Sequence, residues 1–557
     1  MIYNIIIVFL LIPFVLFSNI TKSQTQINKK INKTIEEKIE EKIKKKRIEK
    51  TKEADEINTK NKIVTSQKEI NKSPDITNSN TDGEKTYKNL TELIIDIFSN
   101  IDFNDSKISF TLLDDKSKEL ISVNKDLKLN PASVSKLIVS LAAIKYLGLN
   151  YKFKTNFYID NEIDKDGILD GNLIVKGFGD PNLLSEDIYK IINFLKIIGL
   201  KEIKGNIIID LSFFDKKYSI YKMKKEDESR AYAAFNNALP LNYNSFKFII
   251  KPYIDEENEN NNKIDINISY PASMLIKLKN KLVLSKWYSR IKAKTSKSRY
   301  HNTELELTGR INKKINLLLL YRRIQNPDYY FGKIFFKMLR YSKIKVRGKL
   351  RIKYKNQIKH NKNVKLLYSY HTKYLLDTLI VMNRYSNNFI AEQLLKIIGA
   401  KFSKTEESEG IGSWENGIKA VKEMLKIDIK IAPNTYQYTN ASGLNDANLF
   451  SSSQIAKILY FVKNNFDYKW YLLSTLPKIG ISGTLKRYCL SENCRGAVIA
   501  KTGSLRTTVA LAGFINISNK LHTFSLLINF DSSKEKFRKL LKQAKNLITN
   551  LTSLENL

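Results

Sequence analysis

Histidine and cysteine are scarce in this chain of 557 residues. The four histidines lie at positions 301, 360, 371 and 522, without metal-ligand spacing. We therefore expect neither a metal site nor a catalytic Ser-His-Asp triad. The two cysteines, Cys489 and Cys494, also lack the spacing of a zinc or redox motif. In an exported protein they can close a small disulfide, whereas in a reducing compartment they would stay free thiols.

Acidic residues are outnumbered, with 56 Asp and Glu against 94 Lys and Arg and a formal net charge of +38. Such a charge could serve nucleic acid, an anionic polymer or an acidic membrane surface. Lys, Asn and Ile are abundant everywhere, even in apolar segments, which indicates compositional drift rather than a binding stripe. No nucleic-acid-binding motif stands out, so no nucleic-acid partner is expected. The 43% of hydrophobic residues suffices for a large core and more than one domain.

No Lys or Arg precedes the first apolar run, residues 5–17, and the first basic residue is Lys22. The run has the length of a signal-peptide core and is shorter than a membrane span. Residues 1–23 are therefore a signal peptide, with Thr21 and Ser23 as small residues before the cut, or an uncleaved membrane anchor. Both alternatives predict export to the periplasm or the extracytoplasmic cell envelope. No cysteine lies close behind the run, which excludes a lipoprotein.

Aromatic residues are absent from residues 24–85, which are charged and of low complexity. Such a stretch cannot bury a core, so it is interpreted as a spacer. After it, residues 108–113 and 120–123 predict two strands joined by a turn. A helical run from Ser133 to Leu147 follows, and it is apolar on most faces, which predicts a buried helix.

Ser133 and Lys136 are three residues apart, so on a helix they share a face. Ser133 stands at the helix start, where backbone N–H groups point outward. A serine with a lysine amine one turn on has the parts of an activated nucleophile. The pair alone is weak evidence, because Ser122–Lys125 and Ser533–Lys536 have the same spacing and a solvated helix pair is the ordinary interpretation.

Two further motifs give this pair a context. Ser386-Asn387-Asn388 lies in a break between helical patterns at 374–382 and 391–398, where a side chain can face a cleft; the alternative is a serine N-cap. Lys501-Thr502-Gly503 occurs once, at the end of a predicted strand over 497–504. The glycine there allows another backbone to come close.

The three motifs, in this order, resemble those of the penicillin-interacting serine enzymes, which are the penicillin-binding proteins and serine β-lactamases. Ser133 and Ser386 are 253 residues apart, and short β-like runs fill the interval. This spacing resembles the class C penicillin-binding proteins, the D-alanyl-D-alanine carboxypeptidase/endopeptidase family with domains inserted after the nucleophile helix. The local sequence is similar over residues 87–545. The stretches that carry the similarity are 130–137, 171–183, 203–210, 382–395, 442–444, 483–485 and 500–513.

The resemblance implies an α/β (α+β) fold, a penicillin-binding domain whose antiparallel sheet is flanked by helices, with inserted β-rich domains. The expected catalytic domain comprises 86–150 and 356–557, and the inserted domains comprise 151–355. The sequence shows two departures from the family pattern. Ser504 stands where threonine is usual and keeps the hydroxyl, and Asn440-Ala441 replaces Asp-Gly before Ser442.

The resemblance also implies residue roles. Ser133 is the nucleophile and Lys136 its base, which must be neutral; burial and the nearby charge of Lys501 favour that form. Asn388 orients Lys136, and Ser386 relays a proton to the leaving amine. Lys501 is also expected to be catalytic, and Thr502, Gly503 and Ser504 are expected to bind the substrate, whose terminal carboxylate suits Lys501, Thr502 and Ser504. The N–H groups of Ser133 and Ser504 would form an oxyanion hole.

The predicted function is that of a serine-type D-Ala-D-Ala carboxypeptidase or endopeptidase, which acts on peptidoglycan stem peptides through an acyl-enzyme on Ser133. No cofactor or metal is expected, and β-lactams would be covalent inhibitors. A β-lactamase is one alternative, and the long spacing argues against it. A catalytically silent envelope scaffold of the same fold is another, and the complete set of motif residues argues against that.

Overall fold

The computed structural model describes residues 76–77, 106–221, 223–224, 226–255, 257–258, 261–358, 363–489, 494–531 and 533–552. The predicted leader, nearly all of the predicted spacer and a helical stripe expected at 90–97 lie outside these ranges. Over the described ranges, no helix is both long and apolar enough to cross a membrane. By its internal contacts the chain divides into residues 1–73 and 74–557, and all described residues belong to the second unit.

An antiparallel sheet of six strands forms the centre of the predicted catalytic domain, in the order β1-β3-β2-β20-β19-β18. The strands are β1 (Ile76–Thr77), β2 (Ser106–Leu113), β3 (Glu119–Val123), β18 (Val498–Leu505), β19 (Thr508–Ile517) and β20 (Lys520–Phe530). Phe110 of β2 pairs with Leu526 of β20, so strands from the two ends of the described chain lie side by side. Both faces of β19 and β20 are buried, which explains their nearly continuous apolar sequence.

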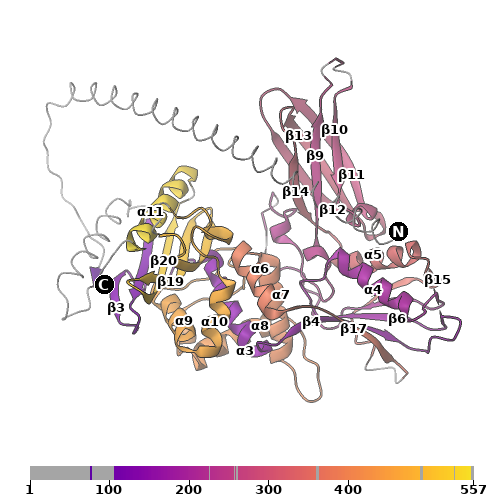
Figure 1. The fold of residues 1–557 in the computed structure, drawn as a ribbon, viewed down its shortest axis with the longest axis horizontal. Helices are drawn as coiled ribbons and strands as arrows, with labels where there is room; N and C mark the ends of the chain where they lie inside the picture. The colour runs from indigo at the N-terminus through magenta and orange to yellow at the C-terminus, as the bar shows by residue number, and fades with distance from the viewer. Residues whose placement is uncertain are drawn as a thin grey trace, which may run out of the picture. The chain divides into compact units, whose positions relative to one another are not determined.

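Helices cover both faces of this sheet (Figure 1). The C-terminal helix α11 (Lys534–Thr552) packs on one face through an apolar stripe that includes Leu540, Leu547 and Leu551. The other face meets α9 (Ser452–Asn464) and the segment that starts α3 (Lys136–Leu147). The observed sheet and helices confirm the predicted fold class.

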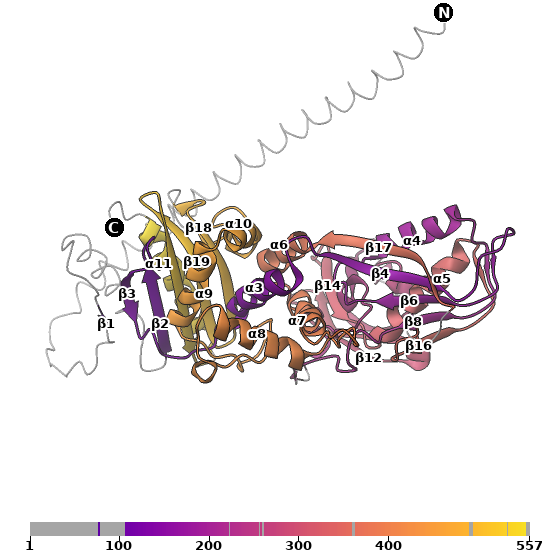
Figure 2. The ribbon, with the colours of Figure 1, turned by 90° about the horizontal axis from the view of Figure 1, so that it is seen from below.

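The nucleophile helix is buried as predicted, because its sequence is apolar all round. A short 3₁₀ helix η1 (Ala132–Ser135) leads into α3, and Gly148, with φ of +87°, ends it. Figures 1 and 2 show the central helices between the six-stranded sheet and the inserted strands. Besides α3 these are α6 (Leu375–Tyr385), α7 (Asn388–Phe402), α8 (Trp414–Ile427) and α10 (Phe466–Thr475).

The part inserted after α3 is built on a mixed sheet of five strands, in the order β16-β8-β6-β4-β17. The strands are β4 (Lys152–Ile159), β6 (Leu173–Gly177), β8 (Ile207–Asp210), β16 (Leu350–Lys353) and β17 (Lys365–Tyr374). β17 pairs antiparallel with β4. The sheet of the inserted part therefore extends past residue 355, and the chain passes from β17 directly into α6.

Smaller sheets complete the inserted part. Two have three strands each, β9 (Ser245–Tyr253), β10 (Lys263–Ile268) and β14 (Leu318–Arg323), and β11 (Ile276–Ser285), β12 (Arg290–Lys297) and β13 (Thr303–Asn312). A third consists of β5 (Ile168–Leu169), β7 (Glu202–Ile203) and β15 (Lys345–Val346). The sequence predicts the β-rich character of this part but not the helices α4 (Ser185–Ile197) and α5 (Pro327–Tyr341). Both bury one apolar stripe, such as Ile188, Ile191, Ile192 and Leu195 in α4.

Candidate active site

The start of α3 brings the predicted nucleophile and base together. The Lys136 side chain is 0% exposed, and its Nζ donates to Ser133 Oγ at 3.0 Å. Two other acceptors surround the same nitrogen, Asn388 Oδ1 at 2.8 Å and the Ser442 carbonyl oxygen at 2.7 Å. Three acceptors match the three protons of an ammonium group. When the amine is neutral, its lone pair can instead accept the proton of the Ser133 hydroxyl.

The environment of Lys136 favours this neutral form. Burial holds the pKa of Lys136 well below its ordinary value, and the charge of Lys501 lowers it further. Glu392 acts in the opposite direction and raises the pKa of Lys136. Because a protonated amine cannot accept a proton, the lowered pKa is what a general base in this position requires. The direction agrees with the sequence-based expectation.

The predicted break around Ser386 is a sharp junction between two helices. Ser386 is the C-cap of α6, in a left-handed conformation with φ of +56°. Asn387 is the N-cap of α7 and accepts from the Ile390 N–H at 3.1 Å, so the capping role considered for Ser386 belongs to its neighbour. Asn388 is then the first residue of α7. The junction directs Asn388 at Lys136 and Ser386 at Lys501.

Strand β18 supplies the Lys-Thr-Gly motif. Lys501 Nζ donates to Ser386 Oγ at 3.1 Å and to its neighbour's carbonyl, Thr502 O, at 2.9 Å. Burial lowers the pKa of Lys501 to about 7. A side chain at Gly503 would place its Cβ only 2.6 Å from the Pro131 carbonyl oxygen, so the glycine permits the close approach of β18 to the nucleophile segment. Ser504 is exposed at the end of this strand.

Several residues of the site were not given roles from the sequence. Thr502 Oγ1 donates to Thr484 Oγ1 at 2.7 Å. The Ser442 carbonyl also accepts from Ser133 Oγ at 3.4 Å. Ser442 and Thr484 lie in the stretches 442–444 and 483–485, which carry the family resemblance, so the sequence did contain a signal for both residues. Tyr221, whose hydroxyl contacts Glu392 and Ser442 Oγ, comes from the inserted part, and no local pattern marks it.

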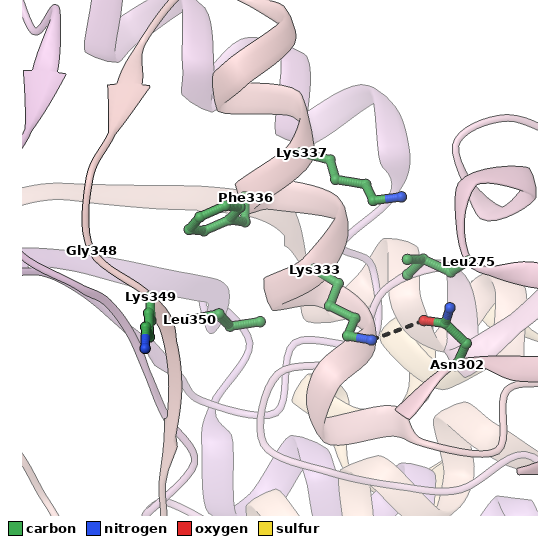
Figure 3. A pocket seen from close by; sticks show the side chains of 8 residues that line it. All are labelled: Leu275, Asn302, Lys333, Phe336, Lys337, Gly348, Lys349 and Leu350. Atoms are coloured by element: carbon green, nitrogen blue, oxygen red, sulfur yellow. Dashed lines mark hydrogen bonds between the residues drawn. The ribbon is translucent and has the colours of Figure 1, made fainter. Parts of the chain in front are cut away.

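Two features lie apart from these groups. Cys489 and Cys494 form a disulfide, which decides between the two states considered for them. A cavity of about 380 Å³ lies in the inserted part, and Figure 3 shows the residues that line it, which fall between Leu275 and Leu350. Lys333, on its wall, donates to Asn302 Oδ1 at 2.8 Å. None of the residues predicted to be catalytic lines this cavity.

A serine beside a buried amine, a Ser-x-Asn junction and a Lys-Thr-Gly strand together define the class of penicillin-interacting serine peptidases. The model of the D-Ala-D-Ala carboxypeptidase 3 (S13) family matches residues 98–551. The chain therefore belongs to that family and is a serine-type peptidase of the penicillin-binding class. This confirms the predicted family, function and enzyme class.

Curated relatives agree with this assignment, and solved structures show the same fold. The D-alanyl-D-alanine carboxypeptidase DacB of Haemophilus influenzae is 28% identical over 429 residues, 75% of this chain and 85% of that protein. A D-alanyl-D-alanine carboxypeptidase of an Actinomadura species is 24% identical over 424 residues, 74% of this chain and 75% of that protein. The crystal structure of penicillin-binding protein 4 of H. influenzae matches with a TM-score of 0.70 and 24% identity, over 82% of this chain and 99% of that one. A second structure of that protein, bound to a β-lactam, gives a TM-score of 0.66.

Proposed function

We propose that this peptidase cleaves the D-Ala-D-Ala bond of peptidoglycan stem peptides through an acyl-enzyme on Ser133. The observation that carries the proposal is the position of Lys136 Nζ, 3.0 Å from Ser133 Oγ in a buried site. Ser133 Oγ attacks the carbonyl carbon of the penultimate D-Ala, and its proton passes to the neutral Lys136 amine. The C–N bond then breaks, and the leaving amine receives a proton through Ser386. Water hydrolyses the ester and frees Ser133.

The substrate carboxylate is assigned to the end of β18. Lys501 supplies a cation below a pH of about 7, and Thr502 and Ser504 supply hydroxyl donors, with Gly503 leaving the strand edge open. The leaving group is either the terminal D-Ala, in a carboxypeptidase reaction, or the amine of a cross-link, in an endopeptidase reaction. The N–H groups of Ser133 and Ser504 are assigned to the oxyanion, where a single donor is often worth about 3 kcal/mol.

The cellular setting follows from the same assignment. A peptidase of peptidoglycan works outside the cytoplasm, so residues 5–17 would direct export and either be removed or remain as an anchor. The disulfide between Cys489 and Cys494 supports an oxidising compartment. We assign residues 86–150 and 356–557 to the catalytic domain and 151–355 to the inserted domains, with β17 completing the inserted sheet.

The test is covalent labelling of the purified chain by a fluorescent penicillin. Ser133→Ala should abolish labelling, since no oxygen remains to acylate. The chain offers a matched control in its chance Ser-x-x-Lys copy, because Ser122→Ala should label like the unmodified protein. Persistent labelling of Ser133→Ala would contradict the assignment of the nucleophile. Digestion of a stem pentapeptide and of cross-linked muropeptides, read by mass, then separates carboxypeptidase from endopeptidase cleavage.

A further inference from the structure

A buried carboxylate lies one helical turn beyond the catalytic asparagine. Glu392 follows Asn388 by four residues on α7, and it is 2% exposed. Its Oε1 accepts from the Ser442 N–H at 2.8 Å and from the Tyr221 hydroxyl. Its Oε2 accepts from Trp414 Nε1 at 2.9 Å. These three partners are neutral donors, so the carboxylate is held by hydrogen bonds rather than by a cation.

The residue that Glu392 holds is the one that contacts the catalytic amine. Ser442 gives its N–H to Glu392, and its carbonyl oxygen accepts from Lys136 Nζ at 2.7 Å. The next residue, Gly443, passes so close to the nucleophile segment that a Cβ on it would lie 1.8 Å from the Ala132 carbonyl oxygen. A small displacement of Ser442 would therefore move its carbonyl oxygen away from Lys136 Nζ. It would also disturb Ala132, the residue before Ser133, through the close packing of Gly443.

We propose that Glu392 is a positioning residue for the acylation of Ser133. It acts through the backbone of Ser442, and it is itself held by Tyr221 of the inserted part. The inference rests on the proposed function, because it concerns the same acylation step. It adds to that function a side chain that does not touch the substrate, and it makes a loop of the inserted part a component of the catalytic site.

The loop that carries Tyr221 is fastened to the same helix face. Lys396, four residues beyond Glu392, is 0% exposed, and its Nζ donates to Asp215 Oδ1 at 2.6 Å and to the Lys217 carbonyl at 2.8 Å. Asn388, Glu392 and Lys396 are spaced by four residues, so they form one polar stripe along α7. The stripe connects the inserted loop at one end to Lys136 at the other.

Glu392 also acts on Lys136 through its charge. The charged or titratable groups that face the pair are Lys501 on β18, Tyr221 on the inserted loop and Tyr438 before Ser442. Of the groups acting on Lys136, Lys501 lowers its pKa and Glu392 raises it. Removal of the negative charge therefore lowers the pKa of Lys136 further. Since the neutral amine is the active form, the acidic limb of the acylation profile should move to lower pH.

The experiment measures the acylation rate of the full chain by a fluorescent penicillin as a function of pH. Glu392→Gln should move the acidic limb to lower pH. It should also lower the maximal rate about tenfold, because the glutamine amide has one acceptor oxygen where the carboxylate has two. That oxygen cannot accept from Ser442, Tyr221 and Trp414 together. The matched control is Glu415→Gln on α8, an exposed carboxylate paired with Lys419, which should leave the profile unchanged. A merely structural role for Glu392 would lower the rate without moving the limb, and that result would overturn the inference.

A second variant keeps the Glu392 charge and removes one hydroxyl group. Tyr221→Phe deletes only the hydroxyl that meets Glu392 and Ser442, so it should slow acylation several-fold with the limb in place. Its control is Tyr232→Phe, which deletes a hydroxyl bonded to Asp227 in the same inserted part. An unchanged rate in Tyr221→Phe would overturn the role given to the loop, even if Glu392→Gln does not fold. If the unmodified chain is not labelled at all, the proposed function is contradicted. If the unmodified chain is labelled and both variants keep its rate and pH profile, only this inference is contradicted.

Discussion

The Lys136 side-chain nitrogen lies 2.8 Å from Asn388 Oδ1, across 252 residues of sequence that include the whole inserted part. The partner is a neutral amide, so it orients the amine without the full negative charge that would keep it protonated. With this partner, burial remains the largest influence on Lys136, and the pKa stays well below its ordinary value. A carboxylate at the same place would reverse that balance.

The first prediction concerns this choice of side chain. Asn388→Asp should raise the pKa of Lys136, because a carboxylate would then stand at hydrogen-bond distance from the amine. The base is active only when deprotonated, so the acidic limb of the acylation profile should move to higher pH. A shift of one unit reduces the neutral fraction, and thus the rate below the pKa, about tenfold. Fluorescent penicillin acylation across pH gives the measurement.

The neighbouring residue provides the control for added charge. Asn387→Asp introduces the same carboxylate, but that side chain caps α7 through the Ile390 N–H, and Asp is an equally good N-cap. The profile of Asn387→Asp should stay close to that of the unmodified protein. If Asn388→Asp shifted no more than Asn387→Asp, the Lys136–Asn388 contact would not control the base.

The second prediction follows from the pKa of about 7 that burial gives to Lys501. A lysine is a cation below its pKa, so the positive charge expected to hold the substrate carboxylate is present below about pH 7 and is lost above it. KM for a peptide ending in D-Ala-D-Ala should therefore rise as pH increases beyond 7, by at most about tenfold per unit. The same peptide with a C-terminal amide should bind weakly at every pH. Parallel KM profiles for the two peptides would contradict the role of Lys501.

The sequence was informative where a motif adjoins a regular pattern. Lys501 to Gly503 follow the apolar run 497–500 and lie within β18, and Ser386 to Asn388 fill a gap between helical patterns, so local periodicity indicated that both motifs could face a site. The order of the three motifs along the chain then indicated that they belong to one site. The contacts of Tyr221 could not be predicted, because they depend on how a loop of the inserted part docks onto α7, and docking of distant segments leaves no local periodicity. Helix α4 was missed because its frequent Ile and Lys satisfy helical and strand spacings alike. Helix α5 was missed because its Tyr and Phe residues are of the kind enriched in strands.

The third prediction tests the close packing behind the nucleophile. Gly443→Ala should destabilise the protein by several kcal/mol, because φ is +68° and the new Cβ would lie 1.8 Å from the Ala132 carbonyl oxygen. Gly148→Ala is the matched comparison. It has φ of +87° and ψ of 159° but no atom within 4 Å of the added Cβ, so only the backbone strain of about 1–3 kcal/mol applies. Thermal unfolding of both variants gives the comparison, and equal losses would mean that Gly443 is needed only for its conformation.

The fourth prediction concerns the fastening of the inserted loop to α7. Lys396→Met should lower the free energy of unfolding by about 2–4 kcal/mol, because the Asp215 carboxylate and the Lys217 carbonyl lose their buried donor. The Asp215 side chain is 23% exposed, so water can replace part of the lost contact and the loss of stability should not exceed this range. The double variant Lys396→Met with Asp215→Asn removes the unpaired charge and should recover part of the loss.

The control is Lys419→Met, which breaks an exposed pair with Glu415 and should change stability by less than about 0.5 kcal/mol. Denaturant unfolding measures all three, and a double variant no more stable than Lys396→Met would show that the amine contributes through its cation–π contact with Trp414 rather than through its pair with Asp215.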